Sequence, residues 1–130
     1  MVLCHVAQFD AYEVAPGKKV NGKLTLGENI ADLGGLAVAH DALMRATAGK
    51  PDPMVEGMTR DQRFFANWAT VWRRAYRPEE EAVRLVTDPH APSMFRAVGT
   101  PSNMEAFAKA FGCKAGDSMV RDGDGRIVIW

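Results

Sequence analysis

Apolar residues recur at intervals of three and four along most of the chain, and this spacing predicts helices joined by loops rich in proline and glycine. The longest predicted helix covers residues 28 to about 48 and ends at Gly49. Residues 3–14 alternate poorly and fit either a short helix or a strand, and residues 15–19 are predicted to turn. The pattern therefore predicts a mainly α fold.

Start and stop signals predict two of the shorter helices. Thr59 and Gln62 have the spacing of a capping box, which predicts a helix from Thr59 to Tyr76. Pro78 and the three glutamates behind it suit the first turn of the next helix. The aromatic stripe of the first of these helices is interpreted as core, because its members recur at helical spacing: Phe64, Phe65, Trp68, Trp72 and Tyr76.

The C-terminal third of the chain combines a loop, a helix and an extended end. Prolines within residues 87–96 predict a rigid loop. A last helix is predicted over residues 102–111, with a capping box at its start and Gly112 as its stop. Residues 127–130 are apolar and β-prone, which predicts a short extended C-terminus with Trp130 buried.

Composition and charge narrow the class of protein. The 130 residues are 47% hydrophobic and 25% charged, which suits one domain with a buried core. Sixteen basic residues balance sixteen acidic ones without a basic stripe, so nucleic acid is not an expected partner. No segment has the pattern of a signal peptide or the apolar length of a membrane span. Cys4 and Cys113 are expected to be free thiols.

Glu28 and Asp32 are the most informative pair, because residues four apart share one face of a helix. Such a pair can bind a metal with one carboxylate while the other orients a neighbouring ligand. Thr25 and Glu28 also have the spacing of a capping box, in which Glu28 would only close the start of the helix. Spacing alone favours this cap, since capping boxes are commoner than partial metal sites.

Further motifs accompany this pair along the chain. They are Val20-Asn21-Gly22, Thr25 to Asp32, Gly34-Gly35, Trp72, Tyr76-Arg77-Pro78, Thr87 to Pro92, Phe95-Arg96, Asn103, Phe107, Phe111-Gly112-Cys113 and Ile129-Trp130. In order and spacing these motifs resemble the neprilysin-like zinc metallopeptidases, which include the endothelin-converting enzymes and bacterial oligopeptidase O. The resemblance covers nearly the whole chain and corresponds to the C-terminal part of the family's catalytic domain.

The resemblance implies a helical subdomain of a gluzincin-type enzyme that hydrolyses oligopeptides with one zinc ion. In this family, zinc is held by two histidines of a His-Glu-x-x-His helix and by a glutamate that matches Glu28. Here His5, His40 and His90 are isolated, and no His-Glu-x-x-His is present. One carboxylate cannot form a zinc site, so residues 1–130, taken as one fragment of the catalytic domain, are expected to be inactive by themselves.

The resemblance also implies roles for other polar residues. Asp32 would orient a group beside the zinc site. His90 matches a histidine that donates a hydrogen bond to the oxyanion formed during hydrolysis, and Asp88 would hold its ring and favour its cationic form. Arg96 matches an arginine that grips a carbonyl of the bound peptide. From the residues alone, an isolated histidine in a loop such as that of His90 is more often a surface or structural residue, and Arg96 could simply form an ordinary salt bridge.

Gly34 and Gly35 lie inside the predicted long helix, where each costs about 1 kcal/mol relative to alanine. They fit the close approach of a second helix, which the resemblance implies is the absent zinc-binding helix, and a kink is the alternative. An exposed face there favours a homodimer. The alternative function is accordingly a non-catalytic helical interaction module or pseudo-enzyme remnant that self-associates.

Family members are generally exported or membrane-anchored facing outward, and the location of this chain is not predicted.

Overall fold

The computed structural model describes residues 2–129 and is mainly helical, as predicted. A short antiparallel hairpin separates the first two helices. In chain order the elements are α1 Val2–Asp10, β1 Glu13–Ala15, β2 Lys18–Lys19, α2 Leu26–Ala46, α3 Arg60–Val71, α4 Pro78–Thr87, α5 Ser93–Gly99, the 3-10 turn η1 Pro101–Asn103, α6 Glu105–Phe111 and the 3-10 turn η2 Gly123–Gly125.

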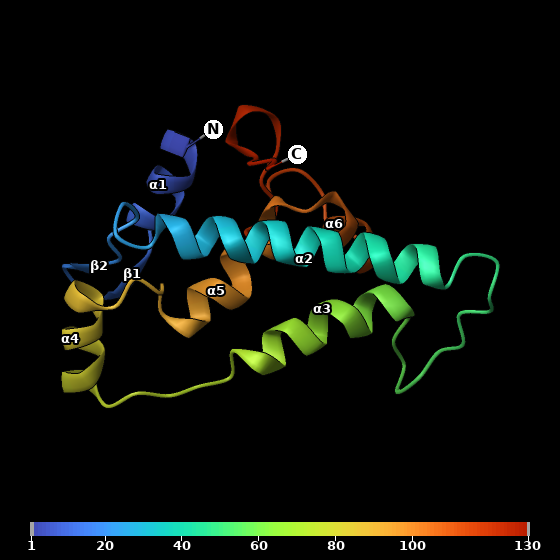
Figure 1. Cartoon of the computed structure of the whole chain (residues 1–130), viewed down its shortest axis with the longest axis horizontal. Coiled ribbons are helices and arrows are strands. Elements are labelled where there is room, and N and C mark those ends of the chain that lie inside the picture. Colours follow the sequence, from blue (N-terminus) through green and yellow to red (C-terminus); the bar gives the residue numbers. More distant parts are fainter. Residues whose placement is uncertain (1, 130) are drawn as a thin grey trace.

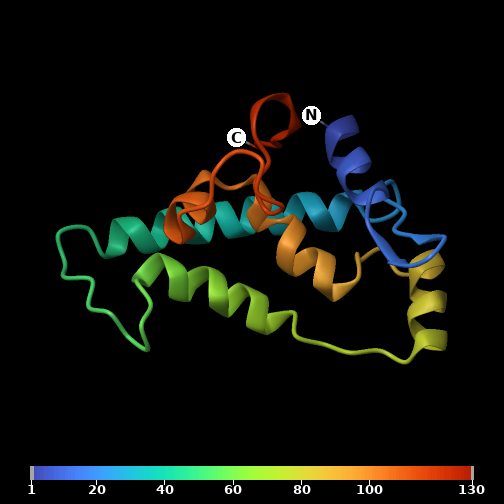
Figure 2. The same ribbon diagram turned by 180° about the vertical axis from the view of Figure 1, so that it is seen from behind.

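The other elements are arranged along the long helix α2 (Figures 1 and 2). Figures 1 and 2 show α1, the hairpin and α4 gathered near its N-terminal end, and α3 running beside its C-terminal half. An extended strand-like linker joins α3 to α4, so these two helices lie at opposite ends of the molecule (Figure 1). The helix α2 continues through both glycines without interruption.

A small apolar core lies where α1, the hairpin, α4 and α5 meet. Phe9 and Phe95 are buried at its centre, and the ring of Tyr12 stacks on that of Phe95 with a centroid distance of 4.6 Å. Val20 and Ala91 complete the buried cluster. This core holds residues 88–96 against the N-terminal part of the chain, and it thereby fixes the segment that carries the polar candidates.

A buried polar network ties α1 to the C-terminal segments. The side-chain amide of Gln8 donates to the carbonyl of Gly99 at 2.9 Å, and that of Asn103 donates to Gln8 Oε1 at 3.0 Å. The backbone N–H of Ile127 donates to Asn103 Oδ1 at 3.0 Å. Because these groups are buried, each hydrogen bond offsets the desolvation of its partners.

The helix α3 begins as predicted. Thr59 and Gln62 form a reciprocal capping box. His40 of α2 faces Asp61 at 3.0 Å, and the buried ring of Phe65 packs edge-on against Phe107 of α6. The interpretation of the aromatic stripe as core is therefore confirmed for Phe65, which contacts the neighbouring helices.

The predicted end of this helix was wrong. The helix α3 stops at Val71 instead of Tyr76, and residues 73–77 form an irregular linker. Arg77 has extended backbone angles, as a residue before proline requires. Arg73, Arg74 and Ala75 are exposed, so this stretch has no apolar stripe that packing could hold in a helix.

Residues 93–99 form the helix α5, where the prolines had predicted a loop. Pro92 lies at the N-cap, a position at which its missing N–H removes no helical hydrogen bond, and its carbonyl accepts from the backbone of Phe95 at 2.8 Å. The predicted cap at Ser102 was also wrong, because its hydroxyl donates to the carbonyl of Gly99 at 2.7 Å. The predicted stop at Gly112 is confirmed by its left-handed backbone (φ 66°).

The chain ends agree in part with expectation. Residues 3–14 contain both a helix and part of a strand. Ile127 is buried in an irregular segment, and Trp130 lies outside the described residues. Cys4 and Cys113 are free thiols, as predicted. Within residues 2–129, every helix is too short or too polar to span a bilayer.

The burial of His5 predicts a stability that depends on pH. His5 is 2% exposed, and its pKa is lowered from the ordinary 6.5, first by burial and then by the positive charge of Arg121. As the pH drops below 6.5, the unfolded chain takes up a proton on His5 that the folded chain does not. The free energy of unfolding therefore decreases as the pH is lowered. We expect urea unfolding at pH 7.5 and 5.5 to show a smaller loss of stability in His5→Phe than in the parent chain. Equal losses in the two chains would show that His5 does not cause the pH dependence.

Candidate functional site

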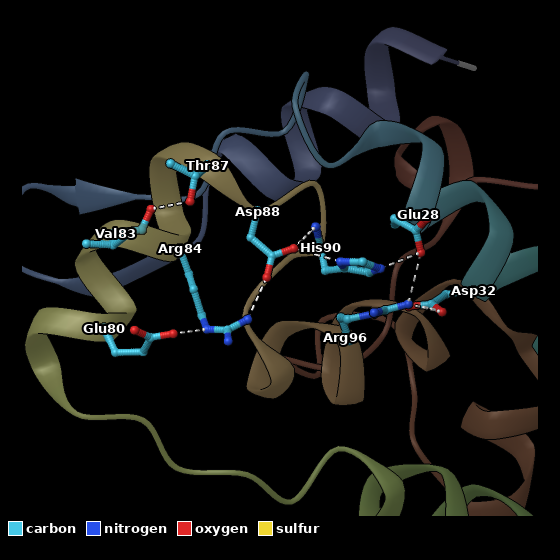
Figure 3. A network of polar contacts seen from close by, with 9 residues as sticks. All are labelled: Glu28, Asp32, Glu80, Val83, Arg84, Thr87, Asp88, His90 and Arg96. Atoms are coloured by element: carbon cyan, nitrogen blue, oxygen red, sulfur yellow. Dashed lines mark hydrogen bonds and ion pairs between the residues drawn. The ribbon is translucent and has the colours of Figure 1, made fainter.

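Five polar side chains predicted from the sequence meet at the N-terminal end of α2 (Figure 3). Glu28 and Asp32 lie one turn apart on this helix. Asp88 caps the C-terminus of α4, His90 follows in the linker, and Arg96 lies on α5. Residues separated by about 60 positions in the chain thus share one site.

The imidazole of His90 lies between two carboxylates. Its Nδ1 is 2.7 Å from Asp88 Oδ1, and its Nε2 is 3.1 Å from Glu28 Oε2. Ionised carboxylates only accept hydrogen bonds, so this geometry suits a ring that donates from both nitrogens. The side chains of His90 and Glu28 are 46% and 39% exposed, which leaves this part of the site open to an incoming ligand.

Asp88 supports the histidine and is itself held. Its Oδ1 also accepts the backbone N–H of His90 at 2.9 Å, and its Oδ2 accepts from Arg84 at 2.8 Å. Partial burial raises the pKa of Asp88, but the hydrogen bonds from His90 and Arg84 outweigh it and bring the pKa below the ordinary value. Asp88 is therefore ionised at neutral pH and keeps Nδ1 of His90 as a donor.

Arg96 and Asp32 form the buried part of the site. Two parallel hydrogen bonds, each 2.6 Å long, join Nε and Nη2 of Arg96 to the two oxygens of Asp32. Both side chains are about nine-tenths buried. The guanidinium also lies 3.6 Å from Glu28 Oε2 and 3.9 Å from the centre of the Trp72 ring. This contact places an aromatic face against a planar cation, a favourable arrangement.

The alternative capping box at the start of α2 is absent. Thr25 occupies the N-cap position, but its side chain makes no capping hydrogen bond. Its hydroxyl instead accepts from Asn29 Nδ2 at 2.9 Å and donates to the carbonyl of Asn21 at 3.1 Å. The carboxylate of Glu28 is thereby free to face His90 and Arg96.

Two residues that contact the site, Arg84 and Trp72, were not predicted to do so from the sequence. Arg84 bridges Glu80 and Asp88 at 2.8 Å each, so a line of alternating charges runs along α4 to His90 (Figure 3). The four-residue spacing of Glu80, Arg84 and Asp88 was the available signal. Trp72 had been assigned to the core, yet it lies at the end of α3 over Arg96.

A cavity of about 490 Å³ opens beside His90 and Arg96. Its wall includes Trp72, Tyr76 and Ser93 together with the charged residues Arg74, Glu81 and Arg84. The cavity therefore adjoins the polar site and combines aromatic faces with charges of both signs.

The described residues do not form a metal centre by themselves. Among residues 2–129, no group of three or more His, Cys, Asp and Glu side chains converges as metal ligands. Glu28 fits the role of one carboxylate ligand, since its side chain is partly exposed and makes no capping bond. A zinc site would need its other ligands from outside this set.

Comparison with known proteins identifies the family. The sequence profile of peptidase family M13 matches residues 1–127. The chain belongs to peptidase family M13. It is 40% identical over 120 residues to Neprilysin-3 of Drosophila melanogaster, and 41% identical over 119 residues to human endothelin-converting enzyme 1. Each alignment covers 89% of this chain and 15% of the relative.

Solved structures of similar proteins share the fold. A cryo-EM structure of the Mycobacterium tuberculosis zinc metalloprotease Zmp1 in an open state matches with a TM-score of 0.93 and 38% identity, over 99% of this chain and 21% of that one. A crystal structure of PepO from Lactobacillus rhamnosis matches with a TM-score of 0.79 and 36% identity, over 99% and 19%. This M13 chain therefore spans about a fifth or less of these proteins. M13 homologues are zinc metalloendopeptidases.

The unequal burial of the two carboxylates predicts unequal effects on stability. Asp32→Asn leaves the buried Arg96 without its charged partner, and we expect a loss of about 3 to 5 kcal/mol. Glu28→Gln weakens a contact with the partly exposed His90 and a longer contact, 3.6 Å, with Arg96, which keeps Asp32, and we expect a loss below about 1 kcal/mol. Urea unfolding of both variants measures these differences, and an equal effect would contradict this division of the site.

Proposed function

We propose that this chain is the C-terminal part of the catalytic domain of an M13 zinc endopeptidase that hydrolyses oligopeptides, with Glu28 as the third zinc ligand. The observation that carries the proposal is the orientation of the Glu28 side chain. Its carboxylate does not cap α2 but points toward His90 and Arg96. Oε1 of Glu28 makes no hydrogen bond among the described residues, so this oxygen can bind a ligand while Oε2 stays beside Arg96. When bound, zinc would supply the Lewis acid that polarises the peptide carbonyl.

His90 is proposed to stabilise the oxyanion that forms on that carbonyl. Asp88 fixes the ring through Nδ1. Nε2 lies 3.1 Å from Glu28 Oε2 on the exposed side of the ring, and its N–H would exchange this contact for the oxyanion when the peptide binds. A donor aimed at developing charge can lower the barrier by about 3 to 4 kcal/mol. The partial exposure of His90 supports this role, because a substrate can reach Nε2.

Arg96 is proposed to bind a carbonyl of the peptide. Its Nε and Nη2 are engaged by Asp32, and its Nη1 makes no hydrogen bond among the described residues. The bidentate pair therefore orients the guanidinium while leaving donor capacity. Asp32 is proposed to act as a positioning residue, through Arg96 and through a zinc-ligating histidine supplied by a preceding segment.

The outer face of α2 supports a partner segment of the enzyme. Its exposed residues Ala31, Gly35, Val38 and Ala42 are small or apolar and recur along one side of the helix. A Cβ added at Gly35 would meet nothing within 4 Å, whereas Gly34 is buried. Small residues let helices approach closely, so we propose that the segment with His-Glu-x-x-His packs on this face. Without it, the chain is expected to be inactive.

Reconstitution tests this proposal. The chain is mixed with a separately produced upstream segment that contains His-Glu-x-x-His, and zinc-dependent cleavage of a quenched oligopeptide is measured. We expect Glu28→Ala to abolish activity by removing a zinc ligand, and His90→Gln to lower kcat by about two to three orders of magnitude.

Two controls make the result specific. Asp124→Asn changes an exposed carboxylate on the η2 turn, remote in the chain from the site, and should leave cleavage unchanged. Circular dichroism must show that each variant is folded. Cleavage that survives Glu28→Ala in a folded complex would refute the assigned ligand.

Gly35→Ala separates assembly from folding. In the chain alone this change fills open space within α2, and we expect an increase in stability of about 0.5 to 1 kcal/mol. In the reconstituted enzyme the added methyl group should weaken association with the upstream segment. Unfolding in urea and titration of the second segment measure the two effects, and unchanged association would count against this packing face.

The alternative function, a non-catalytic module that self-associates, is favoured by the same exposed face. Val38 is 56% exposed in the middle of it. Sedimentation distinguishes the two: a dimer of the isolated chain that is disrupted by Gly35→Ala, together with failed reconstitution, would favour the alternative.

A further inference from the structure

The cavity beside the site is lined by three arginines, of which Arg74 forms no ion pair among the described residues. Arg84 is paired with Glu80 and Asp88, and Arg96 is paired with Asp32. Arg74 also lines the cavity, and among residues 2–129 it forms no ion pair. A permanent, unpaired charge on the cavity wall is a group that a ligand of opposite charge can meet.

Arg74 is placed by its neighbours although its side chain is exposed. The guanidinium carbon lies 5.2 Å from the centre of the Trp72 ring, and the side chain adjoins Tyr76. The ring of Tyr76 is in turn covered by Arg84 at 4.8 Å. The Arg74 side of the cavity therefore combines aromatic surface with two guanidinium groups.

The surroundings of the Tyr76 hydroxyl are positively charged. Its pKa is lowered first by the Arg74 side chain, against the opposing effect of burial, and then by Ser93 and by the charges of Arg84 and Arg74. Positive surroundings stabilise the anionic form of a phenol, as they would a carboxylate. Glu81 also lines the cavity and has no ion pair among the described residues, but it is not among the causes of this shift.

We propose that Arg74 makes this cavity select an acidic side chain, aspartate or glutamate, of the peptide substrate. The cavity adjoins His90 and Arg96, so a peptide held by Arg96 would extend a side chain into it. This inference rests on the proposed function and adds to it a class of substrate. Arg74 acts as a specificity-determining residue, because it and Arg84 both lie over the aromatic rings on this side of the cavity, where an acidic side chain would meet positive charge.

Binding to the chain itself provides the first test, because it does not depend on catalysis. Amide-capped tripeptides with a central Glu, Gln or Lys are titrated into the chain, and NMR follows the indole N–H of Trp72 and the side chain of Arg74. We expect the Glu peptide to bind about fivefold more tightly than its Gln isostere, the size of effect expected for one partly exposed ion pair.

Substitution of neighbouring arginines separates a local contact from general charge. Arg74→Gln should abolish the preference for Glu over Gln. Arg73→Gln removes the same charge from an exposed residue outside the lining of the cavity and should preserve the preference. Equal binding of the Glu and Gln peptides, equal effects of both variants, or tightest binding of the Lys peptide would each overturn the inference.

Cleavage by the reconstituted enzyme tests the selection during turnover. We expect kcat/KM to favour the acidic substrate by the same factor, and Arg74→Gln to remove that difference with the neutral substrate unaffected. Cleavage without acidic preference would refute the role of Arg74 and leave the proposed function intact. Selective binding of the Glu peptide without any cleavage would refute the proposed function and leave the cavity assignment intact.

Discussion

The bidentate ion pair between Asp32 and Arg96 is the interaction on which the site depends. Both groups are about nine-tenths buried, and a buried guanidinium is tolerated only when a partner compensates its lost hydration. The pair joins α2 to α5 and therefore fixes the segment immediately before α5. That segment carries His90, which the pair holds at hydrogen-bond distance from Glu28.

The site consists of a buried ion pair and a more exposed pair of polar side chains. Asp32 and Arg96 are enclosed and multiply bonded, whereas Glu28 and His90 face open space. Asp88 extends the support from the other direction, since Arg84 and the backbone of His90 both hold it. The fold thus fixes the orientation of these side chains in advance, which under the proposed function would spare the cost of ordering them during binding.

Local signals in the sequence predicted much of this arrangement. The i, i+4 spacing of Glu28 and Asp32 placed both on one face of α2, and the box formed by Thr59 and Gln62 located the start of α3. Local signals failed where tertiary contacts decide. The start of α2 also offered a capping box, and Thr25 instead bonds Asn29, a choice that spacing cannot reveal.

The missed helix α5 and the misplaced end of α3 have related causes. Prolines were counted against a helix in residues 87–96, but Pro92 lies at the N-cap, where a proline removes no helical bond. The rings of Trp72 and Tyr76 continued the helical spacing beyond Val71, although each lies against a guanidinium group, that of Arg96 on α5 or of Arg84 on α4. Periodicity registers that a residue is apolar, but it does not register which surface covers it.

The early end of α3 has a consequence for the cavity. In the structure, Trp72 at the end of α3 lies on Arg96, and Tyr76 in the linker lies against Arg84, so both rings line the cavity. The exposed residues 73–75 offer no apolar stripe that packing could hold in a helix, and Arg77 must be extended before Pro78, so the chain leaves the helix before Tyr76. The linker thereby places Tyr76 on the cavity wall near Trp72, and both rings lie against guanidinium groups there.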